Sequence, residues 1–433
     1  MRRAFGRLPV GLALLAVAWT AVLPVPDAEA GKLKVRKMPQ AWADLRSVPA
    51  DEMTRAEPIR RAGPLAQLRA KLPEAARHSH LQLGERVPSL FERKELETRG
   101  SLARGGGGDT TVIKVAVIRV EFETDRAGDQ TTGDGRFMRE NLDPDIFIDP
   151  APHNEAYFAA HIEAVSRYWQ AMTYGCVRIE GDVFPLNEEF GAYRLTDMAD
   201  YGPTSPDELF SIEGLTNYSR ESLIAADADS NLVWSDYDVY FVVHAGSDWQ
   251  NDVLQNTPID LPTFSIAFSD SDVVVTDEGD SLFTMITYPE TSSQDGFNVG
   301  LNGGIAHDMG HQLGLFDIYN VVTFAPTAGF YDVMDSGNLT SAFVQDPQYP
   351  AEPDSLVEII GVLPSAVGAW SRWLVTFQLG IDPVEIKGDF PRARLRAIQD
   401  QSASLPIGTE KWYRLSISDT EYFLIENRVD DLD

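Results

Sequence analysis

Apolar and polar positions follow two different periods along the chain, and the change of period separates its expected elements. Residues 111–122 form an almost unbroken run of β-branched and apolar side chains, which predicts a buried strand. Residues 154–172 place apolar side chains at a helical spacing, and residues 177–184 alternate as a strand does. The further elements that these patterns predict are strands at 239–243, 265–268, 282–288, 412–417 and 421–428, and helices at 219–228 and from 369 onward. Strands and helices in this succession predict an α+β fold with a mixed twisted sheet.

One stretch, Gly303–Tyr319, combines a helical pattern with residues that carry chemistry. At 100° per residue, His307 and His311 lie within about 40° of each other on one face of a helix. Two histidines four residues apart on one helical face can bind one zinc ion. The opposite side of the helix is expected to be held in a core by Ile305, Met309 and Leu313.

The residues after the histidine pair fit the same metal site. Gly314 can adopt the left-handed conformation that ends a helix, after which the chain can turn back. Such a turn would bring Asp317 towards the ion as a third ligand, through oxygen. Met334, in a turn at 329–337, can pack as a soft floor beneath the two histidines. A histidine pair alone arises by chance, whereas this combination favours a divalent-metal site.

Asp308, beside the first histidine, is the candidate catalytic base. Zinc peptidases with the H-E-x-x-H pattern have Glu at this place, and the Glu takes a proton from water. The aspartate side chain is shorter by one C–C bond of about 1.5 Å. A misplacement of ~1 Å can lower a rate about a hundredfold. The sequence therefore supports a metal site more strongly than it supports catalysis.

The first 108 residues differ in composition from the rest of the chain. Residues 1–30 combine a basic start, an apolar run and the small-residue motif Ala28-Glu29-Ala30, which predicts a secretory signal peptide. An uncleaved membrane anchor is the weaker alternative because the apolar run is short. Residues 31–108 are expected to be a basic pro-segment that ends in the glycine run 105–108. Residues 109–433 are then the expected folded domain, and because the sequence stops amid charged residues, a fragment of a longer chain is one expectation.

Charge is unevenly distributed between these segments. Residues 31–104 contain 16 Lys and Arg against 9 Asp and Glu, a net charge of +7, and residues 1–30 carry +1. Because the whole chain carries −30, residues 105–433 carry −38. A basic segment in front of an acidic domain suggests a pro-segment docked by charge, with a solvated, partly helical tail as the alternative. Nucleic acid is not an expected partner of so acidic a domain.

Cysteine usage and one acidic turn add two smaller expectations. Cys176 is the only cysteine of the 433 residues, so an exported protein would be stabilised without internal disulfides. Asp227–Asn231 offers alternate oxygen ligands at a spacing that suits calcium. The alternative for this stretch is an ordinary acidic turn at the end of a helix.

These motifs together resemble the immune inhibitor A-like metallopeptidases, which are secreted bacterial zinc endopeptidases of the metzincin type. The resemblance covers roughly residues 110–430, and only the metal-binding stretch is highly specific. The segments that carry the resemblance are Tyr168-Trp169 with Tyr174-Gly175, Val243–Gly246, Pro289–Thr291, His307–Tyr319, the turn at Met334 and Glu421–Arg428. The family has Glu where Asp308 stands and favours Pro where Phe316 stands.

The resemblance implies a metzincin-like zincin domain with an active-site helix, preceded by a pro-segment. It implies Zn²⁺ as cofactor, with His307, His311 and Asp317 as ligands, and proteins or peptides as substrates. The same resemblance places Met334 beneath the site and the catalytic base at Asp308. Reserve candidates for the third ligand are Asp335 and Glu290. The expected location is extracellular, with no membrane association after the signal peptide is cleaved.

Two other functions remain open from the sequence. The departure at Asp308 favours a catalytically impaired relative that keeps its metal and acts as an extracellular binding protein. An acidic adhesion module that uses calcium, with no zinc, is the third possibility. Proteolytic activity separates the first two functions, and metal analysis separates the third.

Overall fold

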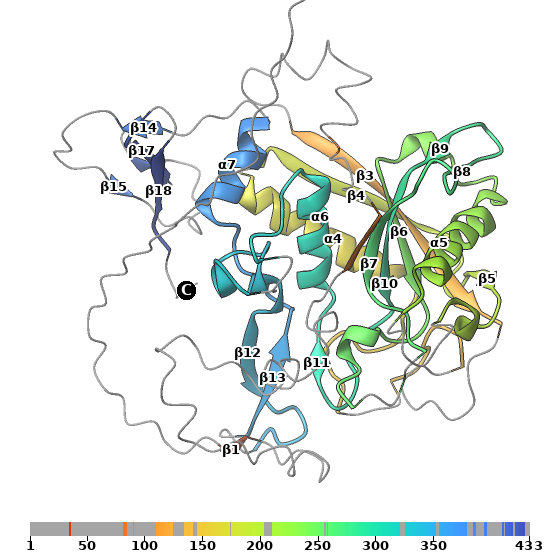
Figure 1. The fold of residues 1–433 in the computed structure, drawn as a ribbon. Coiled ribbons are helices and arrows are strands. Elements are labelled where there is room, and N and C mark those ends of the chain that lie inside the picture. The colour runs from red at the N-terminus through yellow and green to blue at the C-terminus, as the bar shows by residue number, and fades with distance from the viewer. Residues whose placement is uncertain are drawn as a thin grey trace, which may run out of the picture.

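The computed structural model describes most of the folded domain and short parts of the segment before it. The described residues are 34–35, 81–84, 90, 110–123, 134–141, 145–173, 175–202, 210–254, 257, 259–320, 325–351, 355–378, 384–386, 394–395, 409–410, 412–418 and 421–428. The expected signal peptide at 1–30 and the glycine run at 105–108 lie outside them. The described part is a mixed α/β structure built on one large mixed sheet (Figure 1).

The large sheet is mixed because one pair of neighbouring strands runs antiparallel. Its order is β2-β7-β10-β6-β3-β4, and β5 also pairs with β3. All of these pairs are parallel except β7 with β10. The strands are β2 (Leu81–Gly84), β3 (Thr111–Phe122), β4 (Val177–Phe184), β5 (Tyr193–Leu195), β6 (Val239–His244), β7 (Phe264–Ala267) and β10 (Thr284–Pro289). The mixed sheet predicted from the sequence is therefore confirmed.

β3 lies inside the sheet because its side chains are apolar on both faces. Successive side chains of a strand point to opposite faces. Val115 and Val117 enter a core on one face, and Ile118 and Val120 enter a core on the other. A parallel strand covered on both faces needs such a continuous apolar run. This explains why residues 111–122 carry the clearest strand pattern in the sequence.

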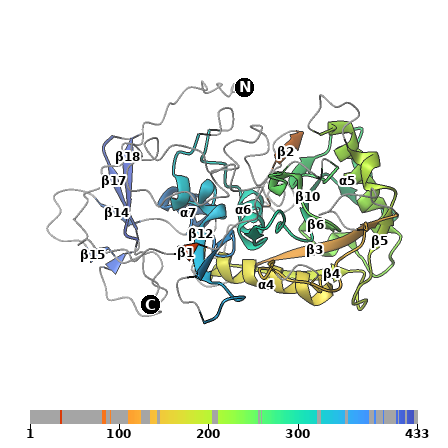
Figure 2. The same ribbon diagram turned by 90° about the horizontal axis from the view of Figure 1, so that it is seen from below.

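Helices cover both faces of the sheet. α4 (Glu155–Met172) and α6 (Asn302–Gln312) pack over one face, and α5 (Ile212–Asp227) packs over the other. Figures 1 and 2 show α4 and α6 on one side of the strands and α5 on the opposite side. The side chain of Trp169 on α4 donates from Nε1 to the carbonyl of Ala306 at 3.2 Å. This contact ties α4 directly to α6.

Side-chain caps set where the two longer helices begin. Asn154 accepts a hydrogen bond from the Tyr157 N–H at 3.1 Å and starts α4 where the sequence predicts it. Ser211 accepts from the Gly214 N–H at 3.0 Å and starts α5 at Ile212. The prediction that this helix starts at Ser219 was wrong. Gly214, Thr216 and Asn217 hid the first turns of the helix, because these residue types have low helix propensity.

A second, smaller sheet adjoins the segment that leads into α6. Its order is β1-β13-β11, with β12 antiparallel to β13 (Figure 1). These strands are β1 (Lys34–Val35), β11 (Asn298–Val299), β12 (Ser341–Gln345) and β13 (Ser355–Ile360). The pair β12–β13 was not predicted from the sequence.

The remaining elements include the predicted late helix and the predicted closing pair of strands. These are α7 (Ala369–Gln378) and antiparallel β17 (Trp412–Ser416) and β18 (Tyr422–Glu426). The shorter strands are β8 (Val274–Val275), β9 (Ser281–Leu282), β14 (Val384–Ile386), β15 (Arg394–Leu395) and β16 (Thr409–Glu410). The 3₁₀ helices are η5 (Met198–Tyr201), η6 (Trp234–Asp236), η7 (Trp249–Asn251), η8 (Gly329–Tyr331) and η9 (Ser336–Leu339). No helix within the described ranges has the length and apolar content needed to cross a bilayer.

Candidate metal centre

α6 is anchored as its apolar pattern predicts. Ile305, Met309 and Leu313 are buried in the core shared with α4 and the sheet. The two histidines are also buried, with 2% of the His307 side chain and 8% of the His311 side chain exposed. The helix is therefore held on all sides, and its imidazoles lie in a nearly dry environment.

Gly314 ends α6 in the way its position predicts. Its φ angle is +83°, in the left-handed region. The N–H of Leu315 donates to the carbonyl of Gly310, and the N–H of Gly314 donates to the carbonyl of His311, both at 2.9 Å. This pair of hydrogen bonds is a Schellman motif, which reverses the chain at a helix end. The reversal carries Asp317 back to the histidines.

The three predicted ligands meet at one point. His307 Nε2 lies 3.0 Å from His311 Nε2. Asp317 Oδ1 lies 3.2 Å from His307 Nε2 and 3.4 Å from His311 Nε2. Among the described residues, this is the group of His, Cys, Asp and Glu side chains whose ligand atoms come close enough to hold a metal ion.

The Nδ1 atoms of the two histidines are held by hydrogen bonds, and these bonds direct the Nε2 atoms to the centre. His307 Nδ1 lies 2.8 Å from the carbonyl oxygen of Val333, and His311 Nδ1 lies 3.1 Å from that of Leu315. A carbonyl only accepts, so each Nδ1 carries the hydrogen and donates it. In the neutral rings each Nε2 is then a lone-pair acceptor directed at the centre. Such hydrogen bonds orient metal-ligating histidines.

The arrangement fits a divalent cation. Three atoms with lone pairs face one another within 3.4 Å. The point equidistant from the three atoms lies about 1.9 Å from each, slightly inside the ~2.0–2.1 Å typical of zinc bonds to N and O. His307, His311 and Asp317 would hold such an ion. Two imidazoles and a carboxylate suit zinc, and also copper, iron or nickel.

Neighbouring side chains favour the ionised form of the third ligand, Asp317. Burial raises the pKa of Asp317, but when the histidines are protonated the charge of His311 and hydrogen bonds from both rings outweigh this effect. The pKa of this carboxyl therefore lies well below its usual range. About a tenth of its side chain, 9%, remains exposed. Asp317 is thus ionised at neutral pH and available to a cation.

Asp308 lies next to this centre but is more deeply buried. Only 1% of Asp308 is exposed. Burial raises the pKa of its carboxyl well above the ordinary value, the charge of His311 lowers it, and the charge of Asp317 raises it. Asp308 thus lies on the helix that carries the histidines, within the electrostatic influence of His311 and Asp317.

The turn at Met334 supports two of the three ligands. Met334 is fully buried, and its sulfur packs against α6 at Gly310. The carbonyl of Val333 receives the hydrogen of His307 Nδ1. The carbonyl of Met334 accepts from the N–H of Ile318 at 2.9 Å, directly after Asp317 in the chain. The turn thus orients the first ligand and holds the backbone next to the third.

The two reserve candidates for the third ligand have other partners. Asp335 Oδ2 accepts from three backbone N–H groups, those of Thr327, Ala328 and Gly329. Glu290 accepts from the backbone N–H groups of Met138 and Gly246 and contacts His153 Nδ1 at 2.6 Å. Both carboxylates hold loops in place.

Tyr319 is a residue of the centre that the sequence did not single out. Burial, followed by the charge of Asp317 and a hydrogen bond with it, raises the pKa of Tyr319. The phenol therefore contacts the third ligand. Its place two residues after Asp317 was the only signal in the sequence. The carbonyl partners of the histidines had no signal, because every residue has a carbonyl.

The acidic turn Asp227–Asn231 has its carboxylates engaged by protein donors. Asp227 accepts from Trp234 Nε1 and from the Asp277 N–H. Asp229 accepts from Tyr193 Oη and from Asn231. These contacts are what an acidic turn at a helix end makes.

Comparison of the sequence with protein-family models and with curated proteins found no match.

Proposed function

We propose that this chain is a secreted zinc-dependent endopeptidase that hydrolyses peptide bonds in proteins. The observation that carries the proposal is the meeting of His307 Nε2, His311 Nε2 and Asp317 Oδ1 within 3.4 Å of one another. Three protein ligands with an open fourth position are typical of catalytic zinc sites, whereas structural zinc sites are closed by four.

The fold and the Met334 turn support the same proposal. We assign the domain to the metzincin-type zincins on its resemblance to the immune inhibitor A-like metallopeptidases. A mixed sheet, a histidine helix over one face and a methionine turn beneath it are compatible with that assignment. The site carries more weight for the function than the fold does, because one fold can host many functions.

The residues of the centre would have two roles in catalysis, metal binding and proton transfer. A bound zinc ion would supply a Lewis acid that polarises the substrate carbonyl and lowers the pKa of water. His307, His311 and Asp317 would hold it, each imidazole kept in one tautomer by its carbonyl partner. Asp308 would accept the proton of the attacking water and return it to the leaving amine.

A pro-segment that docks on the domain is the second part of the proposal. β2, from the expected pro-segment, pairs in parallel with β7 at the edge of the large sheet. β1 pairs in parallel with β13 of the smaller sheet. Both contacts support a latent form, in which the basic segment of the first 108 residues covers strand edges of the acidic domain. Export through the signal peptide would precede activation.

A catalytically impaired metal-binding protein is the rival function. Asp308 supports it, because the side chain is one bond shorter than Glu and is 1% exposed. Such a protein would keep the metal and bind other proteins outside the cell without cleaving them.

Metal analysis of the purified full chain tests the site itself. We expect about one zinc ion per chain, as the three-ligand geometry indicates. The substitution His307→Ala should remove it, and chelation should lower the Tm of the wild-type protein until zinc is restored. A zinc content near zero in both proteins would reject the site.

Proteolysis of an unfolded protein substrate tests the catalysis. The full chain is expressed, residues 31–108 are removed by limited proteolysis, and wild type is compared with Asp308→Ala and Asp308→Glu. We expect Asp308→Ala to lower the rate by about 10²–10⁴, the range for loss of a general base. Equal activity of wild type and Asp308→Ala, with a gain in Asp308→Glu, would instead establish the impaired relative.

A further inference from the structure

β2 and Leu90 come from the first 108 residues, yet both are built into the folded domain. β2 pairs in parallel with β7 over four residues, from Leu81 opposite Phe264 to Gly84 opposite Ala267. The two strands come from parts of the chain that lie on either side of the glycine run at 105–108. A cut in that run would therefore leave them in separate pieces.

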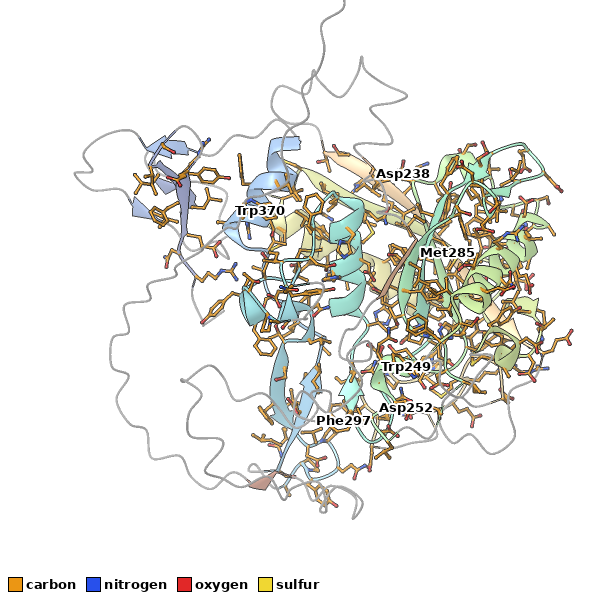
Figure 3. The ribbon with its side chains drawn as sticks, viewed as in Figure 1. Asp238, Trp249, Asp252, Met285, Phe297 and Trp370 are labelled. Carbon is orange, nitrogen blue, oxygen red and sulfur yellow. The ribbon has the colours of Figure 1, made fainter. Side chains whose placement is uncertain are left out.

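Leu83, on β2, is buried in the core on the α5 face of the large sheet. It is 7% exposed, and this core also contains Ile266 of β7 and Met285 of β10. Figure 3 shows Met285 among the side chains between the sheet and α5. Burial of a leucine here favours the bound state, because it removes apolar surface from water.

Leu90 is buried on the opposite face of the same sheet. It is 4% exposed and belongs to the core that contains Ile305, Met309 and Leu313 of the histidine helix. Leu83 and Leu90 are only seven positions apart in the chain, but they enter different cores. The first part of the chain is thus held on both faces of the sheet.

β7 has the sequence of an interior strand, although only β2 separates it from the end of the sheet. Natural edge strands avoid unwanted pairing by carrying charges, prolines or bulges. β4, at the other end of the strand order, follows this rule, because its exposed positions are Arg178, Glu180 and Asp182. β7 reads Phe-Ser-Ile-Ala, without charge or proline. If β2 left, the backbone groups of β7 that bond to it would lose their partners.

Opposite charge does not account for this contact. Residues 31–104 carry +7 and residues 105–433 carry −38, which favours the approach of the two parts. However, neither β2, which reads Leu-Gln-Leu-Gly, nor β7 contains a charged residue. Backbone pairing and the two buried leucines make the contact, and salt does not screen these as it screens exposed charges.

We infer that β2 and Leu90 keep the first part of the chain bound to the domain after the chain is cut in the glycine run. Cleavage then gives a complex of two pieces, and release of the first piece is a separate, later step. The surface that holds this piece is the edge of β7 with one apolar core on each face of the sheet, and it fits an uncharged strand followed by a leucine. The inference goes beyond the proposed latent form, because it separates release from cleavage. It depends neither on the metal nor on peptidase activity.

Cleavage of the full chain after folding tests the inference. A recognition sequence for a site-specific protease is inserted between Gly106 and Gly107, the folded protein is cut there, and the product is run on gel filtration without denaturant. We expect the two pieces to elute together in about 0.15 M NaCl and in about 1 M NaCl, although the Debye length falls from about 8 Å to about 3 Å. Separation at the lower salt concentration would overturn the inference, because cleavage would then suffice for release. Separation only at the higher concentration would overturn it as well, because charge would then hold the pieces together.

Substitution of the two leucines measures what they contribute to binding. In the cut complex, Leu83→Ala and Leu90→Ala should each raise the Kd between the pieces about thirtyfold, the effect of ~2 kcal/mol, which is the low end for a buried leucine. The Kd is measured by gel filtration over a dilution series. Leu363→Ala is the matched control, because Leu363 is 68% exposed and should leave the Kd unchanged.

The inference is also overturned if all three leucine variants hold the first piece as tightly as the unsubstituted protein does. The gel-filtration experiment on the cut chain needs no substitution within the fold. It therefore decides the question even if Leu83→Ala or Leu90→Ala does not fold.

Discussion

The sulfur of Met334 lies so close to Gly310 of α6 that a Cβ atom on Gly310 would sit 2.4 Å from it. The same Cβ would also lie 3.3 Å from the ring of Trp169 on α4. The histidine helix, the methionine turn and α4 thus meet at a point where only hydrogen fits.

This contact predicts that Gly310→Ala is destabilising. Alanine normally stabilises a helix interior by up to about 1 kcal/mol relative to glycine. Here Met334 must move, and overpacking of this kind costs about 1–3 kcal/mol. We expect a lower free energy of unfolding by denaturant and weaker zinc binding, because the turn also holds His307. Gly202→Ala is the control, since its Cβ would meet only the Ala199 carbonyl at 3.4 Å. A neutral or stabilising Gly310→Ala would show that the packing is loose.

A second prediction concerns the end of the helix. Gly314 has φ +83°, and the turn it makes presents the Leu315 carbonyl to His311 Nδ1. Gly314→Ala should cost about 1 kcal/mol of stability and should also weaken zinc binding severalfold. Gly279, at φ +94° in the turn between β8 and β9, provides a matched control. Gly279→Ala has the same backbone penalty, and its zinc affinity should match wild type. Equal zinc affinities in all three proteins would disprove the role of the turn.

The sequence predicted those parts of the metal centre whose residues lie close together along the chain. Two histidines four apart, a glycine at the helix end and Asp317 three residues later are separated by fewer than a dozen positions. Helical geometry alone brings the two histidines together. The part played by Val333 and Tyr319 was not predictable, because a backbone carbonyl and a partly buried phenol have no pattern of their own.

Some elements of the fold were likewise predicted from the sequence, and others were missed. β3 and α4 were predicted because one is apolar on both faces and the other has a clear apolar stripe and an Asn cap. The start of α5 was missed, because Gly214, Thr216 and Asn217 in its first turns have low helix propensity. The pair β12–β13 was missed because many of its side chains are only partly buried, so no clean alternation shows.

His244 predicts how stability depends on pH. The ring is fully buried against Phe122 and Tyr218, and burial lowers its pKa from 6.5 to about 4. The unfolded chain therefore binds this proton more readily than the folded protein does. The contribution of His244 to the free energy of unfolding is present in full above pH 6.5. It is lost as pH falls from 6.5 towards 4, by about 3 kcal/mol in total.

Unfolding by denaturant at several pH values measures this effect. His244→Gln keeps a donor for the Ala245 carbonyl but cannot titrate. We expect the fall in stability between pH 6.5 and 4 to be about 3 kcal/mol smaller in the variant than in wild type. Equal falls in both proteins would mean that His244 reaches water when protonated.

Tyr319 leads to a prediction about zinc affinity, because it contacts a ligand without being a ligand itself. Its phenol forms a hydrogen bond with Asp317 and holds that carboxylate towards the histidines. Removing such a partner typically lowers metal affinity about 10–100-fold. We expect this loss in Tyr319→Phe, measured by competition with a chelator of known zinc affinity, while the free energy of unfolding of the metal-free protein changes little. Tyr331→Phe is the control, because Tyr331 is 65% exposed in the nearby turn and should leave zinc affinity unchanged. If both variants bind zinc as tightly as wild type, Asp317 is held by its backbone alone, through the hydrogen bond from Ile318 to Met334.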